Sequence, residues 1–186
     1  PGHMTKAKRM MQENIKLIDL IIELVDARIP LASRNPDIDE LVKNKARLVL
    51  LNKSDLADSA QNKKWLVYFK KQGAYVLELN AKSGAGIKSI QSMVQEACKE
   101  KIERDRKRGI VNRPVRAMVV GIPNVGKSTF INNVVRKKAA KAENHPGVTK
   151  SLQWIRINED VELLDTPGVL WPKIENQYDA LLLALI

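Results

Sequence analysis

Several features that mark other protein classes are scarce or missing in this sequence of 186 residues. It has one cysteine, Cys98, which excludes an internal disulfide and favours a reducing compartment. Its most apolar run, residues 17–25, is interrupted by Asp19 and Glu23, so no membrane span is predicted. We find no charged-then-apolar opening typical of a secretion signal and no lipidation motif. We therefore expect a cytoplasmic protein without a membrane span.

What the sequence has in excess is positive charge. Lys and Arg number 32 against 21 Asp and Glu, a formal net charge of +11. Such an excess favours a polyanionic partner, either nucleic acid or an anionic membrane, although a solubilising surface gives the same count. The cations gather in residues 1–16 and 99–116, and each stretch alone is equally consistent with a solvated helix face. Aromatic residues make up only 4%, so stacking on single strands is not indicated.

Apolar strands that alternate with amphipathic helices predict an α/β fold with a mostly parallel sheet of six strands. The length suffices for one such domain with a real core. The strands are expected at residues 17–26, 47–52, 74–79, 116–121, 151–157 and 161–165, the last two forming an antiparallel hairpin. The helices are expected at residues 4–16, 37–45, 59–72, 87–106 and 127–138.

The segment GIPNVGKS, residues 121–128, matches the phosphate loop G-x-x-x-x-G-K-[ST] and lies between a strand and a helix. In such a loop the backbone N–H groups face phosphate oxygens, and Gly126 leaves room for that approach. Lys127 is expected to place its cation against the outer phosphates, and the Ser128 hydroxyl to ligate Mg²⁺. The predicted phosphate-binding residues of the loop are Pro123, Asn124, Val125, Gly126, Lys127, Ser128 and Thr129.

Two downstream motifs would complete phosphate and metal binding. DTPG begins at Asp165, which is expected to hold Mg²⁺ through water, and the Gly168 amide would contact the outermost phosphate. The same four residues also make an ordinary turn. HPGVT ends at Thr149, the predicted second hydroxyl ligand of Mg²⁺ unless it is a plain loop threonine. With Lys127, Thr149 and Gly168 form the predicted catalytic set.

NKSD directly follows a predicted strand and indicates guanine recognition. Asp55 is expected to accept hydrogen bonds from the ring N–H and the exocyclic amine of guanine, which adenine cannot supply. Asn52 would reach the other edge of the base and tie the loops together, with the stem of Lys53 over the base. In the later NAKSG, the Ala81 amide would donate to the guanine carbonyl. The predicted guanine-binding residues are Asn52, Lys53, Asp55, Asn80, Ala81 and Lys82.

Together these motifs resemble those of Ras-like, translation-factor-related GTPases, but in a changed order. NKSD and NAK precede GIPNVGKS, HPGVT and DTPG, whereas in most of that superfamily the phosphate loop comes first. The sequence therefore resembles a circularly permuted GTPase with the Ras-like P-loop fold and helices on both faces of the sheet. PGHMTKAKR, DARIP and DTPGVLWPK make it similar to the YlqF/RbgA group over essentially the whole chain.

The permuted order divides the chain into parts. We expect a basic N-terminal helix, residues 1–16, followed by a permuted GTPase domain, residues 17–186. That domain would consist of a guanine-binding half (17–98), a basic linker (99–115) and a phosphate-binding half (116–186). In the group that the sequence resembles, a small helical domain thought to contact RNA follows, and we expect it to be absent here.

The water-positioning glutamine of Ras-like enzymes is replaced by Val169, so unassisted hydrolysis is expected to be slow, about 10⁻⁴ s⁻¹ or less. Three substitutes stay open. His3 matches the group's N-terminal motif, in which a histidine has been proposed to act on water, although Gly-His-Met is also a common cloning remnant. His145 lies on the presumed switch loop. The third is a group from the partner or a K⁺ ion near Asn124, unless Asn124 only stabilises the loop turn.

Two functional hypotheses follow. The resemblance implies a GTP-binding and GTP-hydrolysing switch, with Mg²⁺ and with K⁺ as the open option at Asn124, that assists late assembly of the large (50S) ribosomal subunit by contacting it and its rRNA, as a monomer. The alternative is a GTPase switch whose effector is a protein or a membrane surface. Asp26 and Arg28 of DARIP would either orient the switch loops or the partner, or form a structural pair that fixes their loop.

Overall fold

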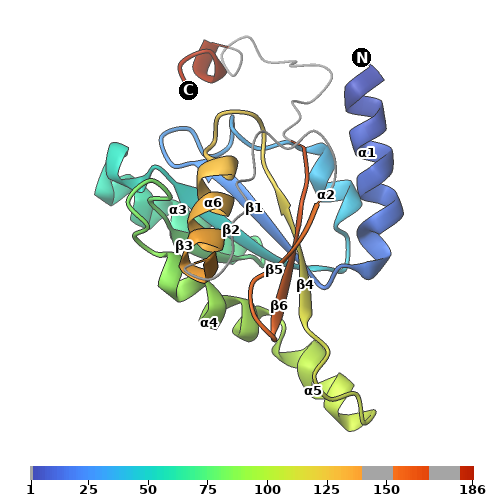
Figure 1. Ribbon diagram of the computed structural model, residues 1–186. Helices are drawn as coiled ribbons and strands as arrows, with labels where there is room; N and C mark the ends of the chain where they lie inside the picture. Colours follow the sequence, from blue (N-terminus) through green and yellow to red (C-terminus); the bar gives the residue numbers. More distant parts are fainter. Residues whose placement is uncertain (1, 140–152, 168–180) are drawn as a thin grey trace.

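The first strand runs through the middle of the protein, and its sequence explains this position. β1 (Leu20–Asp26) reads LIIELVD, and all seven of its residues are buried. A strand that is apolar on both faces requires cover on both sides. In the computed structural model, which describes residues 2–139, 153–167 and 181–186, β1 pairs with β2 on one edge and with β4 on the other (Figure 1).

The sheet has six strands in the order β3-β2-β1-β4-β6-β5. Every pairing is parallel except that of β5 with β6, which are joined by a short turn as the sequence predicted. The fold class, an α/β structure with a mostly parallel six-stranded sheet, is thereby confirmed. The remaining strands are β2 (Ala46–Asn52), β3 (Tyr75–Glu78), β4 (Val115–Val120), β5 (Gln153–Arg156) and β6 (Val161–Asp165).

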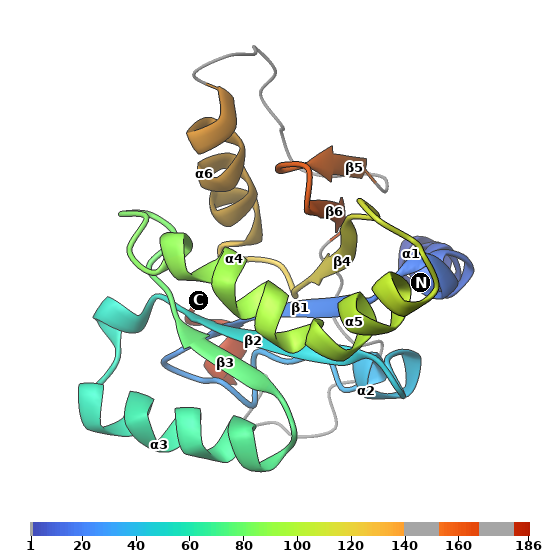
Figure 2. The ribbon, with the colours of Figure 1, turned by 90° about the horizontal axis from the view of Figure 1, so that it is seen from below.

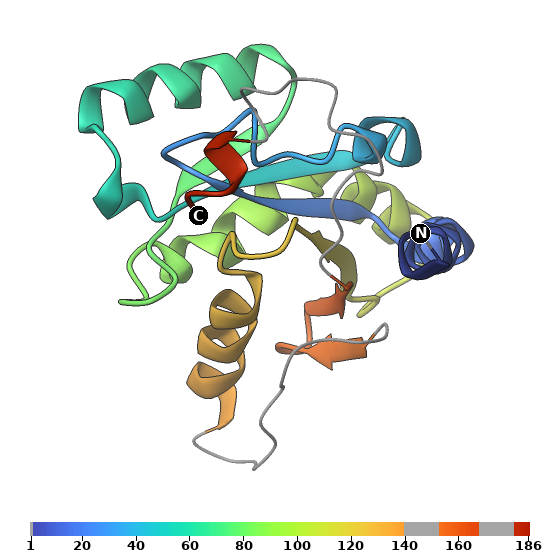
Figure 3. The same cartoon turned by 90° about the horizontal axis from the view of Figure 1, so that it is seen from above.

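Helices cover both faces of the sheet, as predicted (Figures 2 and 3). α4 (Ile87–Ala97) and α6 (Lys127–Ala139) pack on one face. The other face is covered by α1 (Gly2–Asn14), α2 (Asp37–Leu41) and α3 (Ser59–Lys71). Among the helices within the described residues, none is long and apolar enough to cross a membrane.

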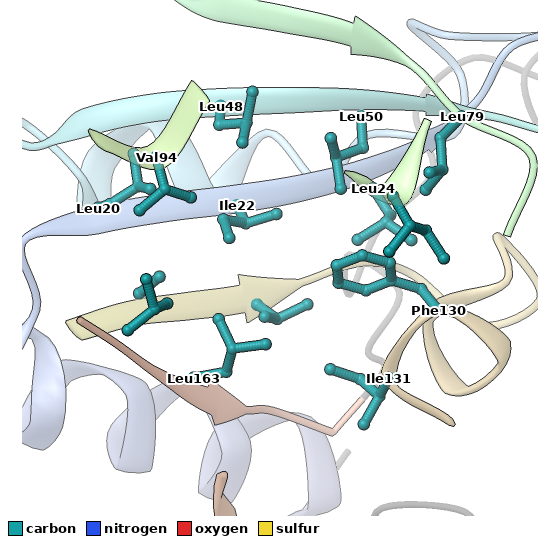
Figure 4. Close-up of a cluster of buried hydrophobic side chains, with 14 of the residues drawn as sticks. Leu20, Ile22, Leu24, Leu48, Leu50, Leu79, Val94, Phe130, Ile131 and Leu163 are labelled. Atoms are coloured by element: carbon teal, nitrogen blue, oxygen red, sulfur yellow. The ribbon is translucent and has the colours of Figure 1, made fainter. Parts of the chain in front are cut away.

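The main core lies between the sheet and the pair α4 and α6. Leu20, Ile22 and Leu24 project from alternate positions of β1 into this layer, where they pack with Val94 of α4 and Phe130 of α6 (Figure 4). Burying each side chain of this size contributes about 1.5–3 kcal/mol. Because a shift of one residue would turn all of them to the opposite face, this layer also fixes the register of β1.

The helix predicted at residues 37–45 ends at Leu41, and the longest helix prediction was wrong. Residues 87–106 were expected to form a single helix, but the structure has α4 and then α5 (Lys99–Lys107), separated at Cys98. The backbone of Cys98 leaves helical geometry, with φ −104° and ψ 12°, although the hydrogen bonds Cys98 N–H to Val94 and Ile102 N–H to Cys98 continue across the joint. Cys98 is buried, whereas most of α5 is exposed, so the axis bends where the chain leaves the core.

The parallel strands bring several motifs to one end of the sheet. Asp26, Asn52 and Asp165 are the last residues of β1, β2 and β6, and the phosphate loop starts directly after β4. Because these four strands run in the same direction, their carboxyl ends share an edge, where ligands of α/β proteins bind. Figure 3 looks onto this end of the molecule.

Candidate nucleotide-binding site

The phosphate loop after β4 has the backbone that a ligand cradle requires. Asn124 and Gly126 both have positive φ, 70° and 95°, so the chain turns twice within three residues. Between them the Val125 side chain is fully buried and anchors the loop to the core. A Cβ added at Gly126 would collide with the side-chain amide of Asn52, so glycine is required here for close approach as well as for φ.

Four of the residues predicted to bind phosphate are exposed. Pro123 and Asn124 are exposed on the loop, and Ser128 and Thr129 are exposed in the first turn of α6. The N-terminus of α6 therefore presents hydroxyl groups and free backbone N–H groups at the carboxyl end of the sheet. Such a terminus attracts anions.

Lys127 is not exposed with its neighbours. Its side chain is 7% exposed, and its Nζ lies 2.6 Å from Oδ1 of Asp165, whose side chain is 2% exposed. Nζ also donates to the backbone carbonyl of Thr166. Thr166 is in turn held by its hydroxyl, which donates to the Val119 carbonyl at 2.7 Å. The two charged residues expected to serve the outer phosphates and the metal are thus paired with each other.

Asn52 connects the guanine motifs to the phosphate loop. Its Nδ2 donates to the Val125 carbonyl at 2.7 Å, and its Oδ1 accepts the Ala81 N–H at 2.9 Å. The loop-tying role predicted for Asn52 is present, with both amide atoms engaged by the protein. The Ala81 N–H, predicted to donate to guanine, donates to Asn52 in this structure. Asn133 of α6 adds a hydrogen bond to the Ala81 carbonyl.

Lys53 adds a second link to the phosphate loop. Its backbone is left-handed, with φ 58°, and its Nζ donates to the Asn124 carbonyl at 2.7 Å. The same Nζ lies 3.3 Å from Oδ2 of Asp26, a fully buried carboxylate at the end of β1. Lys53 therefore contacts the loop predicted to bind phosphate as well as the DARIP motif.

Asp26 of DARIP is held mainly by Arg28. Its carboxylate accepts hydrogen bonds from the Arg28 backbone N–H at 2.9 Å, from Nε at 3.0 Å and from Nη2 at 2.7 Å. Burial raises the pKa of Asp26, but the Arg28 hydrogen bonds and charge, with the charge of Lys53, outweigh it and lower this pKa below its ordinary value. The structural pair anticipated for DARIP is present, and its link to Lys53 ties it to the guanine motif.

The remaining predicted guanine-binding residues follow β2 and β3, at the same end of the sheet. Asp55 and Lys82 are exposed, so their charged groups face solvent at the end of β2 and beyond β3. Asn80 shapes its own loop, because its Oδ1 accepts the Ser83 N–H at 3.1 Å. The nearby Asp58 caps α3 by accepting the Gln61 N–H at 2.9 Å. Of the two carboxylates, Asp58 is thus committed to the helix, whereas Asp55 points outward.

Comparison with known proteins agrees with this arrangement. The family described as 50S ribosome-binding GTPase matches residues 116–184. Ribosome biogenesis GTPase A of Bacillus cereus is 52% identical over 184 residues, which are 99% of this chain and 62% of that protein. The crystal structure of GNP-bound YlqF from Thermotoga maritima is 32% identical, with a TM-score of 0.65 over 94% of this chain and 63% of that one.

The chain belongs to the YlqF/RbgA family. It spans slightly less than two thirds of the length of these relatives. A YlqF structure with GDP bound is similar to it as well, at 31% identity and a TM-score of 0.66. The motif order in this sequence matches the topology, because β2 and β3, which lead into NKSD and NAK, come before β4 and its glycine loop in the chain yet lie in the same sheet.

Some residues with predicted roles are only partly placed or not placed. His3 lies in the first turn of α1, whose amino end is at the same end of the molecule as the phosphate loop (Figure 1). His145, Thr149, Gly168 and Val169 lie outside the described residues. Within the described part of the chain, no three His, Cys, Asp or Glu side chains gather to hold a metal.

Sequence reasoning missed three participants that the structure brings in. Thr166 was considered only as part of DTPG. Its carbonyl accepts a hydrogen bond from Lys127, and its buried hydroxyl donates to the Val119 carbonyl. Asn133 gave no signal, because a polar residue in the second turn of α6 is unremarkable by pattern. Asp26 ends β1 and Lys53 directly follows β2. Only the knowledge that these two strands pair would have revealed the ion pair between them.

Proposed function

We propose that this chain binds GTP and GDP in one site shared by its two halves, residues 17–98 and 116–186, and hydrolyses GTP. The observation that carries the proposal is the link from Asn52 and Lys53 to the carbonyls of Val125 and Asn124. These contacts hold the base-recognition motif against the phosphate loop, so that one nucleotide can contact both. The related structures of GNP-bound and GDP-bound YlqF support the same ligand class.

In this proposal each motif has one task. Asp55 accepts the ring N–H and the amine of guanine, and the exposed loop amides with Lys127 take the phosphates. Ser128 and Asp165, with Thr149, are the residues that would hold Mg²⁺; this donor set of oxygens suits a hard cation that also binds phosphate oxygens. When bound, Mg²⁺ neutralises negative charge on the phosphates. Lys127 must leave Asp165 to reach the nucleotide, because its Nζ is engaged there.

The attacking water would be positioned by His3 or through K⁺ held near Asn124. The amino end of α1 lies at the same end as the loop, which supports His3 (Figure 1). Asn124 is exposed at the rim of the loop, where an amide oxygen can meet a cation next to phosphate. Its positive φ also fits a role in the turn alone. Equal hydrolysis rates in KCl and NaCl at matched ionic strength would remove the K⁺ part of the proposal.

The partner that fits best is the large ribosomal subunit during its assembly in the cytoplasm, met by the chain as a monomer. Relatives are named ribosome biogenesis GTPase A, and the net charge of +11 suits a particle rich in phosphate. Slow unassisted turnover would then be raised by the particle. The alternative partner, a protein or membrane effector, has no comparable support among the relatives.

GTP turnover with and without precursors of the large subunit, in KCl, tests the proposal. We expect stimulation of at least tenfold by the particles and loss of most of that stimulation in His3→Ala. An unstimulated chain that sediments with anionic vesicles but not with particles would overturn the ribosomal part. Failure to bind GDP or GTP in a direct titration would overturn the nucleotide part. A stimulated rate unchanged by His3→Ala would remove His3 alone.

A further inference from the structure

The charged residues of α3 are all lysines. Its thirteen residues include four lysines, Lys63, Lys64, Lys70 and Lys71, and no acidic residue. All four are exposed. Within residues 2–139, 153–167 and 181–186, none of them forms an ion pair with a carboxylate. Their charges are therefore free to act on something outside the chain.

The two stretches that stand out as basic in the sequence are different. α5 has five cations but also three acidic residues, and Lys101 lies 3.2 Å from Asp19 and 3.1 Å from Asp105. In α1, Arg9 is paired with Glu13 at 3.3 Å and Lys8 with Asp37 at 3.7 Å. The three acidic residues of α5 lower its net charge to +2, and in α1 two of the three basic residues are in ion pairs. Counting Lys and Arg along the sequence could not reveal the ion pairs with Asp19 and Asp37, because these two partners come from outside these helices.

The four lysines also share one face. At about 100° per residue they fall within about 160° of the helix circumference, together with Val67 and Tyr68. The opposite side of α3, with Phe69 fully buried, packs on the sheet. Figures 2 and 3 both show α3 at the rim of the molecule, with its outer side uncovered by other described elements. We call this surface the α3 lysine face: Lys63, Lys64, Val67, Tyr68, Lys70 and Lys71.

An aromatic ring is fixed on this face. Tyr68 is 38% exposed, and its ring makes edge contacts with Trp65 at 5.4 Å and with Phe69 at 5.2 Å between centroids. Lys64 and Lys71 lie one turn before and one turn after it. A ring held in place between two ammonium groups costs little entropy when it packs on a sugar or a base.

We propose that the α3 lysine face docks on the phosphate backbone of RNA, which rests on the proposed function and names the surface that serves it. Ammonium groups spaced along a helix are suited to phosphates as point charges. An anionic membrane fits less well, because a helix that lies in lipid needs a broad apolar side. Here the apolar side is used by the core, and the exposed large apolar residues of α3 are Val67 and Tyr68.

The test compares two charge reversals of equal size. Lys64→Glu with Lys71→Glu changes the α3 lysine face, and Lys99→Glu with Lys107→Glu changes exposed positions of α5 by the same net charge. Binding to large-subunit precursors would be measured by sedimentation between 50 and 300 mM KCl with a GTP analogue. We expect the α3 variant to bind at least tenfold more weakly at the lowest salt, with a salt slope reduced by about 1.5. The α5 variant should lose less than threefold, and both should bind GDP like the unchanged chain.

The outcomes separate the two claims. If the unchanged chain binds particles and the two variants lose affinity equally, the α3 lysine face is no site and only this inference is overturned. If the α3 variant loses binding to anionic vesicles but not to particles, the partner is lipid and the inference is likewise overturned. If the unchanged chain binds neither particles nor ribosomal RNA, the ribosomal part of the proposed function fails with it. Tyr68→Ala should lose about threefold in particle affinity without a change in salt slope; no loss would remove the ring from the surface.

Discussion

The two halves of the candidate site are held in different ways. On the guanine side, Asn52 forms neutral hydrogen bonds with backbone atoms of the Val125 and Ala81 loops. On the phosphate side, Lys127 and Asp165 are held by each other, although both are expected to serve the ligand. On the guanine side Asp55 and Lys82 are exposed, whereas in the proposed function Lys127 would have to leave Asp165 to reach a nucleotide.

In the proposed function, this difference would affect what each half contributes to nucleotide binding. A preassembled loop is already ordered, so contacts to the base add to affinity with little loss of entropy. A buried ion pair that must open subtracts from the affinity, because the new contacts of Lys127 replace existing ones rather than water. We infer that base specificity comes from the guanine side, where Asn52 links the loops. The phosphate side would be the part whose contacts change with the state of the ligand.

The largest expected effect concerns base recognition on the guanine side. In Asp55→Asn, the carboxylate that accepts two guanine hydrogen bonds becomes an amide, whose NH₂ suits the extra carbonyl of xanthine. The preference for GTP over XTP should fall by about 10³-fold or more, since unpaired polar groups discriminate strongly. Competition titrations with both nucleotides measure it. Asp58→Asn is the matched control, because that carboxylate caps α3. Equal base preference in the two variants would show that Asp55 does not contact the base.

The next largest effect is expected at Asn52, whose side chain links the Val125 and Ala81 loops. Asn52→Ala leaves the Val125 carbonyl and the Ala81 N–H without their partner, which should lower the free energy of unfolding by about 3 kcal/mol. Urea unfolding gives this value. Asn62→Ala is the comparison, because Asn62 is equally buried but makes one bond, to Ser54 only eight residues away. We expect it to cost about half as much. If Asn62→Ala lowers the free energy of unfolding more than Asn52→Ala does, the long-range hydrogen bonds of Asn52 are not the stronger contribution to stability.

Local and long-range features of the protein also differ in how well the sequence predicts them. Strands such as β1 and the glycine turn between β4 and α6 were predicted correctly, because burial on both faces and the glycine spacing are local signals. The joint at Cys98 was missed, since helical periodicity continues through it and only the packing of that side chain against the core bends the axis. Local pattern therefore predicts elements well and the angles between them poorly.

The residue types of the site were predictable, but their mutual contacts were not. The motifs name Asn52 and Lys127 as functional, yet the partners of Asn52 lie 29 and 73 positions away in the chain. Nothing in the sequence indicates that Lys127 rests on Asp165 rather than facing outward. Such pairings follow from the sheet order, which brings β2, β4 and β6 to one edge.

A smaller effect is expected at DARIP and depends on pH. Asp26→Asn removes the charge that holds Arg28 and Lys53, at a cost of about 2 kcal/mol at pH 7. The pKa of Asp26 is lowered by folding, so its carboxylate stabilises the fold above the ordinary value of 3.8, and this contribution is lost as the pH falls through the lower folded value. Urea unfolding at pH 7, 5 and 3 should therefore show a gap between the two proteins that closes only below about 3.8. A gap that persists undiminished at pH 3 would mean that the charge of Asp26 is not its source.

The smallest effect should change sign with Mg²⁺, and it tests the phosphate half. In Asp165→Asn the anion that holds Lys127 is neutralised, so the lysine is released more readily to the phosphates. Without Mg²⁺, GDP affinity should rise by about fivefold, which corresponds to about 1 kcal/mol. With excess Mg²⁺ it should fall instead, because the variant lacks a carboxylate for the metal.

Isothermal titration of GDP in EDTA and in Mg²⁺ measures both values. Glu162→Gln is the control, since it removes a carboxylate from the same strand that faces Arg116 at 3.3 Å. A loss of affinity under both conditions would show that Asp165 supports nucleotide binding without competing for Lys127. The phosphate half would then be as preassembled as the guanine half, and the contrast between them would lie in the kind of bond alone. A rise in EDTA confined to Asp165→Asn instead identifies the ion pair as the resting state that the nucleotide must open.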